Sequence, residues 1–341
     1  MLRRSDLGGQ IAACTIHKMK RPFQFAVRAS RPGPDISWRD MACRAEDLGY
    51  RTFLMSDHVA GPGVAMERTG HPPGGLAVAP ALMALAEATT QLRVGSRVSC
   101  IDYHHPVVLA KEMATIDLLS EGRLEVGLGA GWLAGEYEAL GIPFEAASER
   151  IERLDEVVTL MKELFGGGQV TFHGKHFNVE GFEGAPRPVQ LPHPPIAIGG
   201  GARRVLQLAG RVADIVSFNY DNRSGLLGTQ GVQSGDANHT TQKLQWIREG
   251  AGDRFDEVEI EIGIYFADVT REPLALAERL GATFGLTTSE IMSHPHALFG
   301  SVDYLCDELE RRREVYNISY VSIPEDQAVA FAPVVHRLAG K

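Results

Sequence analysis

The pair Asp57-His58 places a carboxylate beside an imidazole, directly after the apolar segment 51–55. An imidazole can donate a hydrogen bond or transfer a proton near neutral pH, and a neighbouring carboxylate can hold its ring in one orientation. In an ordinary loop, Asp57 would cap a turn and His58 would be a surface side chain. Because the pair follows a buried strand, at the end where parallel strands bind ligands, we predict that both residues are catalytic.

Three glycines, Gly199, Gly200 and Gly201, lie between an apolar strand and a helix. The backbone N–H groups of such a turn can approach a phosphate closely, and the helix N-terminus favours an anion. Arg203 and Arg204 follow, and either can add a charge-assisted hydrogen bond. A tight turn with two solvated arginines explains the motif almost as well. The position late in the chain favours the phosphate site.

Small residues also end the strand 124–128, in the sequence Gly129-Ala130-Gly131-Trp132. The spacing of these glycines does not match the dinucleotide fingerprint GxGxxG. Small residues at a strand end let a flat ring lie close to the backbone, and Trp132 would then wall that ring. A tryptophan packed on the rim of the fold explains the local sequence equally well.

The histidines and cysteines give no indication of a metal site. His104 and His105 are adjacent and point in different directions, so we predict a structural or rim role for them. The four cysteines lack CxxC spacing, and the chain has no HExxH, GxSxG or SxxK motif. We therefore expect no metal, and reduced thiols in a cytoplasmic protein.

The elements that must position these residues follow from short apolar segments that alternate with amphipathic ones. Ser37 is predicted to cap a helix, Pro106 to open one, and residues 148–165 to form a helix with one apolar face. The segment 170–182 is predicted to be an inserted hairpin. The other predicted strands are residues 23–28, 51–55, 92–98, 124–128, 195–198, 214–218, 258–266 and 318–323.

Eight strands separated by helices predict a parallel sheet with right-handed crossovers, closed into a (β/α)8 barrel with insertions. No linker-like composition divides the chain, so we predict a single domain over residues 21–341. Residues 1–20 contain Arg3-Arg4 but lack the apolar segment of a signal peptide. We interpret them as an extension, with Met19 as an alternative start.

Charge and hydropathy argue against two classes of partner. The formal net charge is −9 without a basic stripe, so we expect no nucleic-acid binding. No apolar run is long enough to cross a bilayer, so we expect no membrane association. The expected partner is a small-molecule substrate. Anions are included, because a local pocket need not follow the sign of the whole chain.

Residues 92–132, LRVGSRVSCIDYHHPVVLAKEMATIDLLSEGRLEVGLGAGW, resemble the luciferase-like monooxygenase superfamily. The shared order is a strand, a His-Pro helix start, a Leu-Ser-x-Gly-Arg turn and a Gly-x-Gly-x-Gly-Trp strand end. The resemblance covers residues 22–340, and the most similar subgroup is the actinobacterial F420-dependent oxidoreductases. Further matching segments are EYEALGIPF (136–144), PRPVQ (186–190), PIAIGGG (195–201) and ISYV (318–321).

The resemblance implies a site at the mouths of the strands. It places Asp57 and His58 in the family's acid-histidine motif, where the histidine contacts the reactive edge of the cofactor ring. Many members have a non-prolyl cis peptide at the position of Arg97-Val98, pressing on the ring. We add Arg203 as a cofactor contact on chemical grounds alone. The other implied cofactor contacts are Gly129, Ala130, Gly131, Trp132, Gly199, Gly200, Gly201 and Asn219.

Two hydride carriers fit the resemblance, and the protein would orient either of them. F420 is a deazaflavin that moves hydride without reacting readily with oxygen, whereas reduced FMN adds oxygen and supports monooxygenation. The subgroup and Ser56-Asp57-His58 favour F420, although nothing physical in the sequence excludes FMN. We predict an F420-dependent oxidoreductase in which His58 orients the ring or shuttles a proton. Its small organic substrate would be selected by loops 61–75, 132–147, 221–240 and 282–300.

Three other functions stay open. One is an FMN-dependent monooxygenase with a separate reductase, and another is a relative that binds cofactor without turnover. The intact Asp57-His58 pair and glycine loop argue against the second. A metal-dependent barrel hydrolase needs a His-x-His at the end of the first strand, where this chain has Val27-Arg-Ala-Ser30. The resemblance also implies a homodimer, with the early helices as its contact surface.

Overall fold

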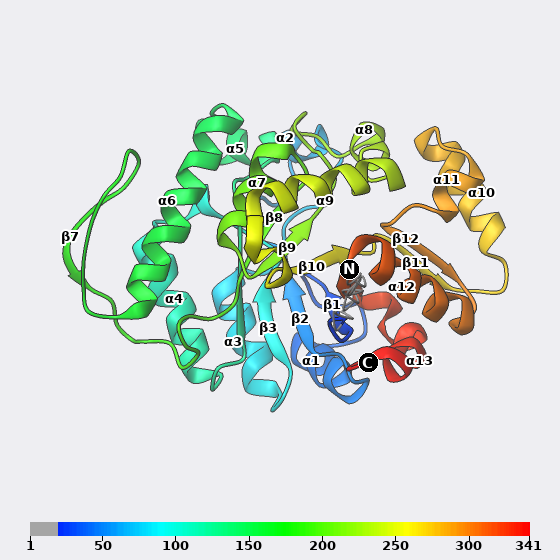
Figure 1. Ribbon diagram of the computed structural model, residues 1–341, viewed down its shortest axis with the longest axis horizontal. Helices are drawn as coiled ribbons and strands as arrows, with labels where there is room; N and C mark the ends of the chain where they lie inside the picture. The colour runs from blue at the N-terminus through cyan, green and yellow to red at the C-terminus, as the bar shows by residue number, and fades with distance from the viewer. Residues whose placement is uncertain (1–19) are drawn as a thin grey trace, which may run out of the picture.

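The computed structural model describes residues 20–341, and within this range eight parallel strands close into a barrel (Figure 1). The order is β3-β2-β1-β13-β10-β9-β8-β5, and β5 pairs back onto β3, which closes the ring. The short strand β4 continues β3 along β5. The strands are β1 (Gln24–Arg28), β2 (Thr52–Met55), β3 (Arg93–Ser96), β4 (Ser99–Cys100), β5 (Leu124–Gly129), β8 (Ile196–Gly200), β9 (Ile215–Phe218), β10 (Glu259–Gly263) and β13 (Ile318–Pro324).

A long helix follows each barrel strand, which confirms the predicted (β/α)8 fold. At the start of the first helix, Ser37 Oγ accepts the N–H of Asp40 at 3.1 Å. Pro106 is the first residue of the helix that follows β4. Both helix starts are as predicted. The outer helices are α1 (Trp38–Asp47), α3 (Val78–Ala88), α4 (Pro106–Leu119), α6 (Ala147–Gly166), α7 (Arg203–Val212), α9 (Ala237–Ala251), α12 (Val302–Tyr316) and α13 (Ala328–Leu338).

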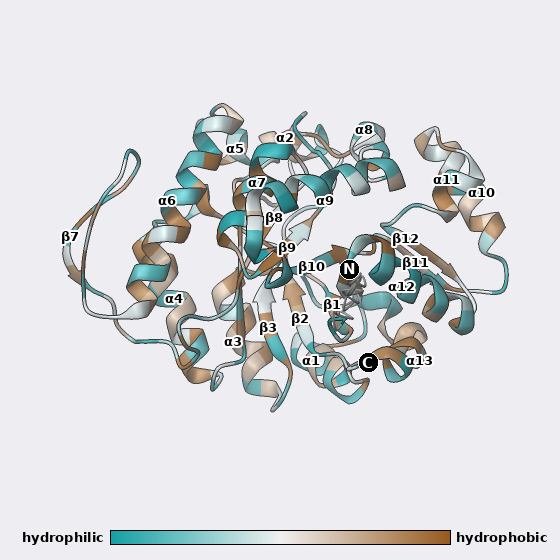
Figure 2. Cartoon of the chain, in the orientation of Figure 1, coloured by the Kyte–Doolittle hydropathy of each residue, from teal (hydrophilic) through white to brown (hydrophobic). Residues whose placement is uncertain are grey.

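Strand alternation divides the buried residues between two layers. Phe25 and Val27 belong to the main apolar core between strands and helices, whereas Ala26 between them belongs to a small cluster with Tyr320. The barrel interior also holds buried carboxylates, and Tyr320 Oη donates to Glu125 at 2.9 Å. Hydrophobic residues lie along the central strands and in patches on the surrounding helices (Figure 2). The apolar outer layer therefore holds the barrel, while its interior is free to carry polar groups.

Two insertions interrupt the repeat. The hairpin β6 (Gln169–His173) and β7 (Asn178–Glu183) is antiparallel, as predicted, and projects from the barrel (Figure 1). The second insertion, after β10, comprises β11 (Phe266–Val269), α10 (Pro273–Phe284), α11 (Thr288–Met292) and β12 (Ala297–Gly300). The predicted strand 258–266 therefore ends early, at Gly263. The Tyr265 N–H donates to the His296 backbone carbonyl at 2.9 Å, and the chain leaves the barrel there to pair with β12.

The predicted strand 92–98 is also interrupted. β3 ends at Ser96, the Arg97–Val98 peptide bond is cis, and β4 begins at Ser99. The cis bond confirms the expectation drawn from the resemblance. The interruption turns the chain at the mouth of the barrel, where both residues line a cavity.

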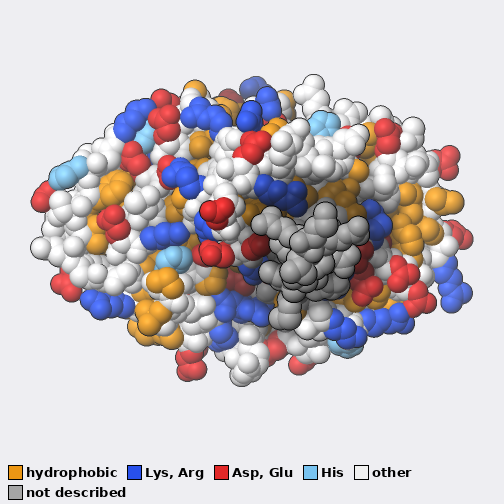
Figure 3. All heavy atoms as spheres, in the orientation of Figure 1, with side chains coloured by type: hydrophobic (Ala, Val, Ile, Leu, Met, Phe, Trp, Pro, Cys, Tyr) orange, Lys and Arg blue, Asp and Glu red, His pale blue; other side chains and the backbone are white. Residues whose placement is uncertain are grey.

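Loops at the mouth carry three short helices in the described range: α2 (Val64–Glu67), α5 (Ala134–Leu140) and α8 (Thr229–Gln233). None of the described helices combines the length and the apolar character that a membrane span requires. On the face shown in Figure 3, basic and acidic side chains are interspersed. The extension predicted for residues 1–20 lies outside the described residues, apart from Lys20.

Candidate functional site

A cavity of about 560 Å³ opens where the barrel strands end. Residues that end or follow seven of the eight strands, all but β13, line it, in keeping with the rule that barrels place their ligands at this end. All the predicted site residues except Arg203 line it. They are Asp57, His58, Arg97, Val98, Gly129, Ala130, Gly131, Trp132, Gly199, Gly200, Gly201 and Asn219.

A second cavity, of about 420 Å³, is lined by residues near the starts of β2, β3 and β5, among them Arg51, Arg93 and Arg123. Arg93 forms an ion pair with Glu125 at 2.9 Å. Arg123 donates to the backbone carbonyls of three residues at 2.8–2.9 Å. Because these guanidinium groups are committed to the fold, we place the chemistry in the first cavity.

The imidazole of His58 is held by Glu136 and not by its sequence neighbour. His58 Nδ1 lies 2.8 Å from Glu136 Oε2, and Glu136 is buried. The other carboxylate oxygen accepts the N–H groups of Val59 at 2.8 Å and Ala60 at 3.1 Å. Glu136 therefore fixes both the loop after β2 and the ring, and Nε2 is the nitrogen left to meet a ligand.

Burial and hydrogen bonding act in opposite directions on Glu136. Burial alone would raise its pKa, but the hydrogen bond and charge of His58, with the Ala60 N–H and the Tyr103 hydroxyl, lower it overall. Tyr103 Oη donates to Oε2 at 3.0 Å. Glu136 is thus ionised at neutral pH and can only accept hydrogen bonds. The proton of the His58–Glu136 bond therefore lies on Nδ1.

Asp57 pairs elsewhere. Its Oδ2 lies 2.7 Å from His104 Nε2 and accepts the Cys100 N–H at 3.2 Å. Burial would lower the pKa of His104, but the hydrogen bond and charge of Asp57 raise it overall. The prediction that Asp57 orients His58 is wrong, because neighbouring residues of an extended segment point in opposite directions. His104 has the structural role that was predicted for it.

Two rings border His58. The His71 ring centroid lies 4.0 Å from that of His58, and Trp132 meets His58 edge-on at 6.1 Å. Burial, helped by the neighbouring His58, lowers the pKa of His71 to about 4, so this ring is neutral at neutral pH. Trp132 lines the cavity and contacts both histidines. This favours the prediction that it forms a wall of the ligand site over the alternative that it packs on the rim of the fold.

Val98 and a set of glycines form the floor of the cavity. A Cβ atom on Gly129 would lie 2.6 Å from Val98 Cγ2, and one on Gly199 would lie 3.0 Å from Val98 Cγ1. Gly131 has φ +71°, and a Cβ there would lie 1.8 Å from Tyr137 Oη. Larger residues would push against Val98 or distort the strand ends, which explains the small residues after β5 and β8.

The turn from β8 into α7 offers donors to an anion. Gly200 and Gly201 line the cavity, and the N-cap residue Ala202 makes no side-chain cap. The N–H groups of the first helical turn therefore have no partner within the helix. Arg203 does not reach the cavity: its side chain is 61% exposed and pairs with Glu249 at 3.2 Å. Its place in α7 directs it to the outer surface, so the structure does not support it as a cofactor contact.

Sequence reasoning missed the cavity residues Arg28, Glu136 and Tyr265, and it did not foresee the partners of Arg97. Arg97 Nε lies 2.9 Å from Glu261 Oε2, and its Nη1 lies 3.2 Å from Tyr265 Oη. Arg28, the last residue of β1, stacks on the Tyr265 ring at 4.7 Å from the centroid. The signal was present, since a charged residue at a barrel strand end or inside an apolar strand needs a partner. For Glu136 the indication in the sequence was weaker, namely its position four residues after Trp132.

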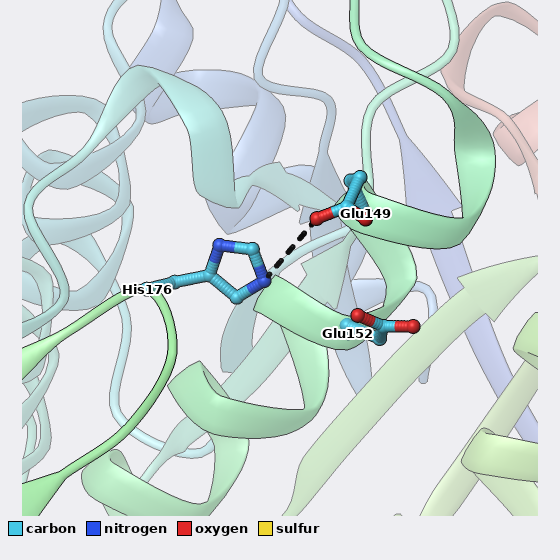
Figure 4. A group of neighbouring side chains, drawn as sticks. All are labelled: Glu149, Glu152 and His176. Carbon is cyan, nitrogen blue, oxygen red and sulfur yellow. Dashed lines mark ion pairs between the residues drawn. The ribbon is translucent and has the colours of Figure 1, made fainter.

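Glu149, Glu152 and His176 gather outside the cavity, on α6 and the hairpin (Figure 4). Their potential ligand atoms lie within 4.8 Å of one another. Lys175 Nζ lies 2.7 Å from Glu149 and 3.0 Å from Glu152, so an ammonium group already bridges the two carboxylates. Both carboxylates are at least 40% exposed. We interpret this group as a surface ion-pair network.

The sequence model of luciferase-like monooxygenases matches residues 25–225. An F420-dependent glucose-6-phosphate dehydrogenase of Nakamurella multipartita is 31% identical over 274 residues, covering 78% of this chain and 74% of that protein. One of Microbacterium testaceum is 33% identical over 199 residues, covering 58% and 56%. An FMNH(2)-dependent dimethylsulfone monooxygenase of Pseudomonas putida is 33% identical over 143 residues, covering 42% and 39%. The chain thus spans 56% and 39% of the lengths of the last two relatives.

Solved structures show the same fold. An F420-dependent secondary alcohol dehydrogenase in complex with an F420-acetone adduct has a TM-score of 0.70 at 18% identity, covering 93% of this chain and 98% of that one. A long-chain alkane monooxygenase has a TM-score of 0.72 at 16% identity, covering 94% and 92%. At these identities the likeness establishes the barrel with its insertions.

Proposed function

Because the chain belongs to the luciferase-like monooxygenase family, we propose that it is an F420-dependent oxidoreductase that transfers a hydride between this deazaflavin and a small organic substrate. Two of the relatives named above are F420-dependent dehydrogenases. The observation that carries the proposal is the Glu136-bound imidazole of His58 at the wall of a cavity floored by Val98 and glycines.

The residues fit a flat cofactor that bears a phosphate. Gly129 and Gly199 leave room for the Val98 side chain, and together they form an apolar floor on which a tricyclic ring can lie. At one end of that floor the β8–α7 turn offers backbone N–H groups to a phosphate. A Cβ atom on Gly201 would lie 2.0 Å from the Tyr220 carbonyl oxygen, so the turn cannot carry a side chain as built. Trp132 closes the cavity beside the ring position.

When bound, the deazaflavin would supply the carbon that gives or takes the hydride. The chain's own residues bind and orient the cofactor and the substrate. They also take up the proton that is released when a carbon bearing a hydroxyl or amino group is oxidised. His58 Nε2 is the group placed to accept that proton or, in the reverse direction, to return it. Glu136 holds the ring in the tautomer that leaves Nε2 able to accept. Asp57 and His104 hold the neighbouring backbone in place.

FMN-dependent monooxygenation is the second candidate. It is favoured by the similarity to the Pseudomonas putida enzyme, whose name includes FMNH(2). The cavity floor suits an FMN ring as well as a deazaflavin ring, since both are tricyclic. A cofactor binder without turnover is less well supported. The buried carboxylate of Glu136 orients the imidazole of His58, and a protein that only binds the cofactor would not need an oriented imidazole.

Titration of the purified chain with F420 and, separately, with FMN tests the proposal through the change in cofactor fluorescence. Tight F420 binding with weak FMN binding is the expected result, and it would justify a substrate screen. Tight binding of FMN alone would move the protein to flavin monooxygenation, with oxygen as the next reagent. Binding of neither cofactor would contradict both candidates.

A further inference from the structure

Two guanidinium groups line the cavity, and one of them pairs with a buried carboxylate. Arg28 and Arg97 both line the cavity, and their Cζ atoms lie 4.7 Å and 6.0 Å from the ring centroid of Tyr265. Arg97 pairs with Glu261 at 2.9 Å. Arg28 donates from Nη2 to the Ile264 carbonyl at 2.6 Å and forms no ion pair with a described carboxylate. One positive charge is therefore left over.

Each guanidinium also keeps a buried N–H without an acceptor among the described residues, namely Arg28 Nε and Arg97 Nη2. Glu261 cannot supply the missing acceptors, because its oxygens already accept Arg97 Nε and the hydroxyls of Ser217 and Ser322. Buried charged donors are normally paired. An anion bound in the cavity beside the two guanidinium groups would balance the charge that is left over.

The other arginines of the cavity lining are already engaged. Arg150 donates to the Gly131 carbonyl at 2.6 Å, and Arg223 pairs with Asp221. The β8–α7 turn is also remote, because β1 and β8 are four strands apart in either direction around the ring. Arg28 therefore lies across the barrel from the turn that suits the cofactor phosphate.

We propose that Arg28 and Arg97 form a subsite for the carboxylate of the substrate, which makes the substrate class a small organic acid. That the bound acid is the substrate rests on the proposed function, whereas the anion subsite itself rests on the geometry alone. A carboxylate carries one negative charge, which matches the single uncompensated positive charge. Its two coplanar oxygens match the fork of a guanidinium.

Arg28 stays charged under physiological conditions. Burial, followed by the charge of Arg97, lowers its pKa to about 10, which leaves the group protonated at neutral pH. The Tyr265 ring packs against its face, so the side chain is held in one orientation before a ligand arrives. An anion would thus meet a charge that is already in place.

The test is calorimetric titration of the full chain, without cofactor, with benzoate and with benzamide, its neutral planar analogue. Inorganic phosphate is present throughout to occupy the β8–α7 turn. We expect benzamide to bind at least tenfold more weakly than benzoate. Arg28→Met should weaken benzoate binding at least tenfold, and Arg28→Lys should weaken it less. Arg211→Met should leave it unchanged, because Arg211 is 57% exposed and pairs with Asp155 outside the cavity.

Equal binding of benzoate and benzamide by the wild-type chain would overturn the proposal, and so would full benzoate affinity in a folded Arg28→Met. If Arg28→Met does not fold, the wild-type comparison and Arg28→Lys decide the question. The same proteins are titrated with F420. Benzoate selectivity without F420 binding would contradict the proposed function and leave the subsite standing, and the opposite pattern would reject the subsite alone.

Discussion

The proton-handling ring of His58 is oriented by a carboxylate 78 residues further along the chain. Glu136 is ionised, because its hydrogen bonds lower its pKa despite burial. Its two oxygens divide their tasks, one holding the imidazole and the other the backbone of Val59 and Ala60. A neutral amide of the same shape would keep part of this geometry and lose the charge.

Glu136→Gln is therefore expected to lower kcat about 10- to 100-fold, in the range seen when a group that orients a functional histidine is removed. The F420 dissociation constant should change by less than about threefold, because the floor and the phosphate turn are untouched. Steady-state kinetics and cofactor titration on the same protein measure both. A variant that loses cofactor binding but keeps kcat would show that Glu136 serves the cofactor and not the ring.

His58→Ala should lower turnover by about 10²- to 10⁴-fold, the usual contribution of a positioned acid or base. Cofactor affinity should remain, since the floor is made by Val98 and glycines. The control is His105→Ala, which removes a histidine at the N-cap of α4 that is not part of the cavity lining. Unchanged turnover in His58→Ala, with cofactor bound, would show that the imidazole is not catalytic.

At the scale of elements, the β8–α7 turn depends on close backbone approach. A Cβ atom on Gly201 would lie 2.0 Å from the Tyr220 carbonyl oxygen, so Gly201→Ala must shift the turn away from β9. We expect F420 affinity to fall at least tenfold, and the fluorescence titration measures it. Gly166→Ala, where an added Cβ meets nothing within 4 Å, should bind as the wild type does. Unchanged affinity in Gly201→Ala would remove the turn from the phosphate site.

Local patterning was enough to predict the strands, the outer helices and the hairpin, because each buries an apolar face of the right period. The segment 282–300 was predicted as a variable loop, yet it contains α11 and β12. β12 is a buried strand that pairs with β11, and no local sequence pattern predicts a two-stranded parallel insertion. Partners on the loops of different strands, such as Glu136 for His58, were not predictable for the same reason: their pairing exists only once the ring has closed.

At the scale of the whole molecule, buried histidines link stability to pH. Burial lowers the pKa of His294 to about 4 and that of His296 well below its usual value, and His71 is lowered to about 4. The unfolded chain binds protons on these rings below about pH 6.5, while the folded chain does not until about pH 4. Stability is therefore lost as pH falls through this window. Glu259 opposes the effect, since burial raises its pKa to about 7.

The three histidines with lowered pKa values outweigh Glu259 and His104, whose pKa values are raised, so the free energy of unfolding should fall by on the order of 2 kcal/mol between pH 7 and pH 5. Urea denaturation at the two pH values measures the difference. His294→Asn should reduce the fall, because one of the depressed groups is removed. A free energy of unfolding that is constant or rises towards pH 5 would contradict the assignment of neutral buried rings.

We also propose that the chain forms a homodimer through α4. Val108 and Leu119 lie three turns apart on one face of this helix and are 54% and 55% exposed. The resemblance implies a homodimer with the early helices as its contact surface, and these exposed side chains make α4 the candidate helix. Light scattering should give twice the chain mass for the wild type and the chain mass for Leu119→Glu. Leu274→Glu, on α10 where the leucine is 63% exposed, should remain dimeric. A monomeric wild type would reject the proposal.

The bond between His58 and Glu136 bears on how parts of this barrel can be exchanged between proteins. Loops of a (β/α)8 barrel are often treated as independent modules. Here the loop after β2 carries the imidazole and α5 carries its acceptor, while Asp57 is tied to His104 in the segment after β4. A graft of the β2 loop alone would import a histidine without a carboxylate. Recombination between relatives should therefore succeed when these three segments travel together.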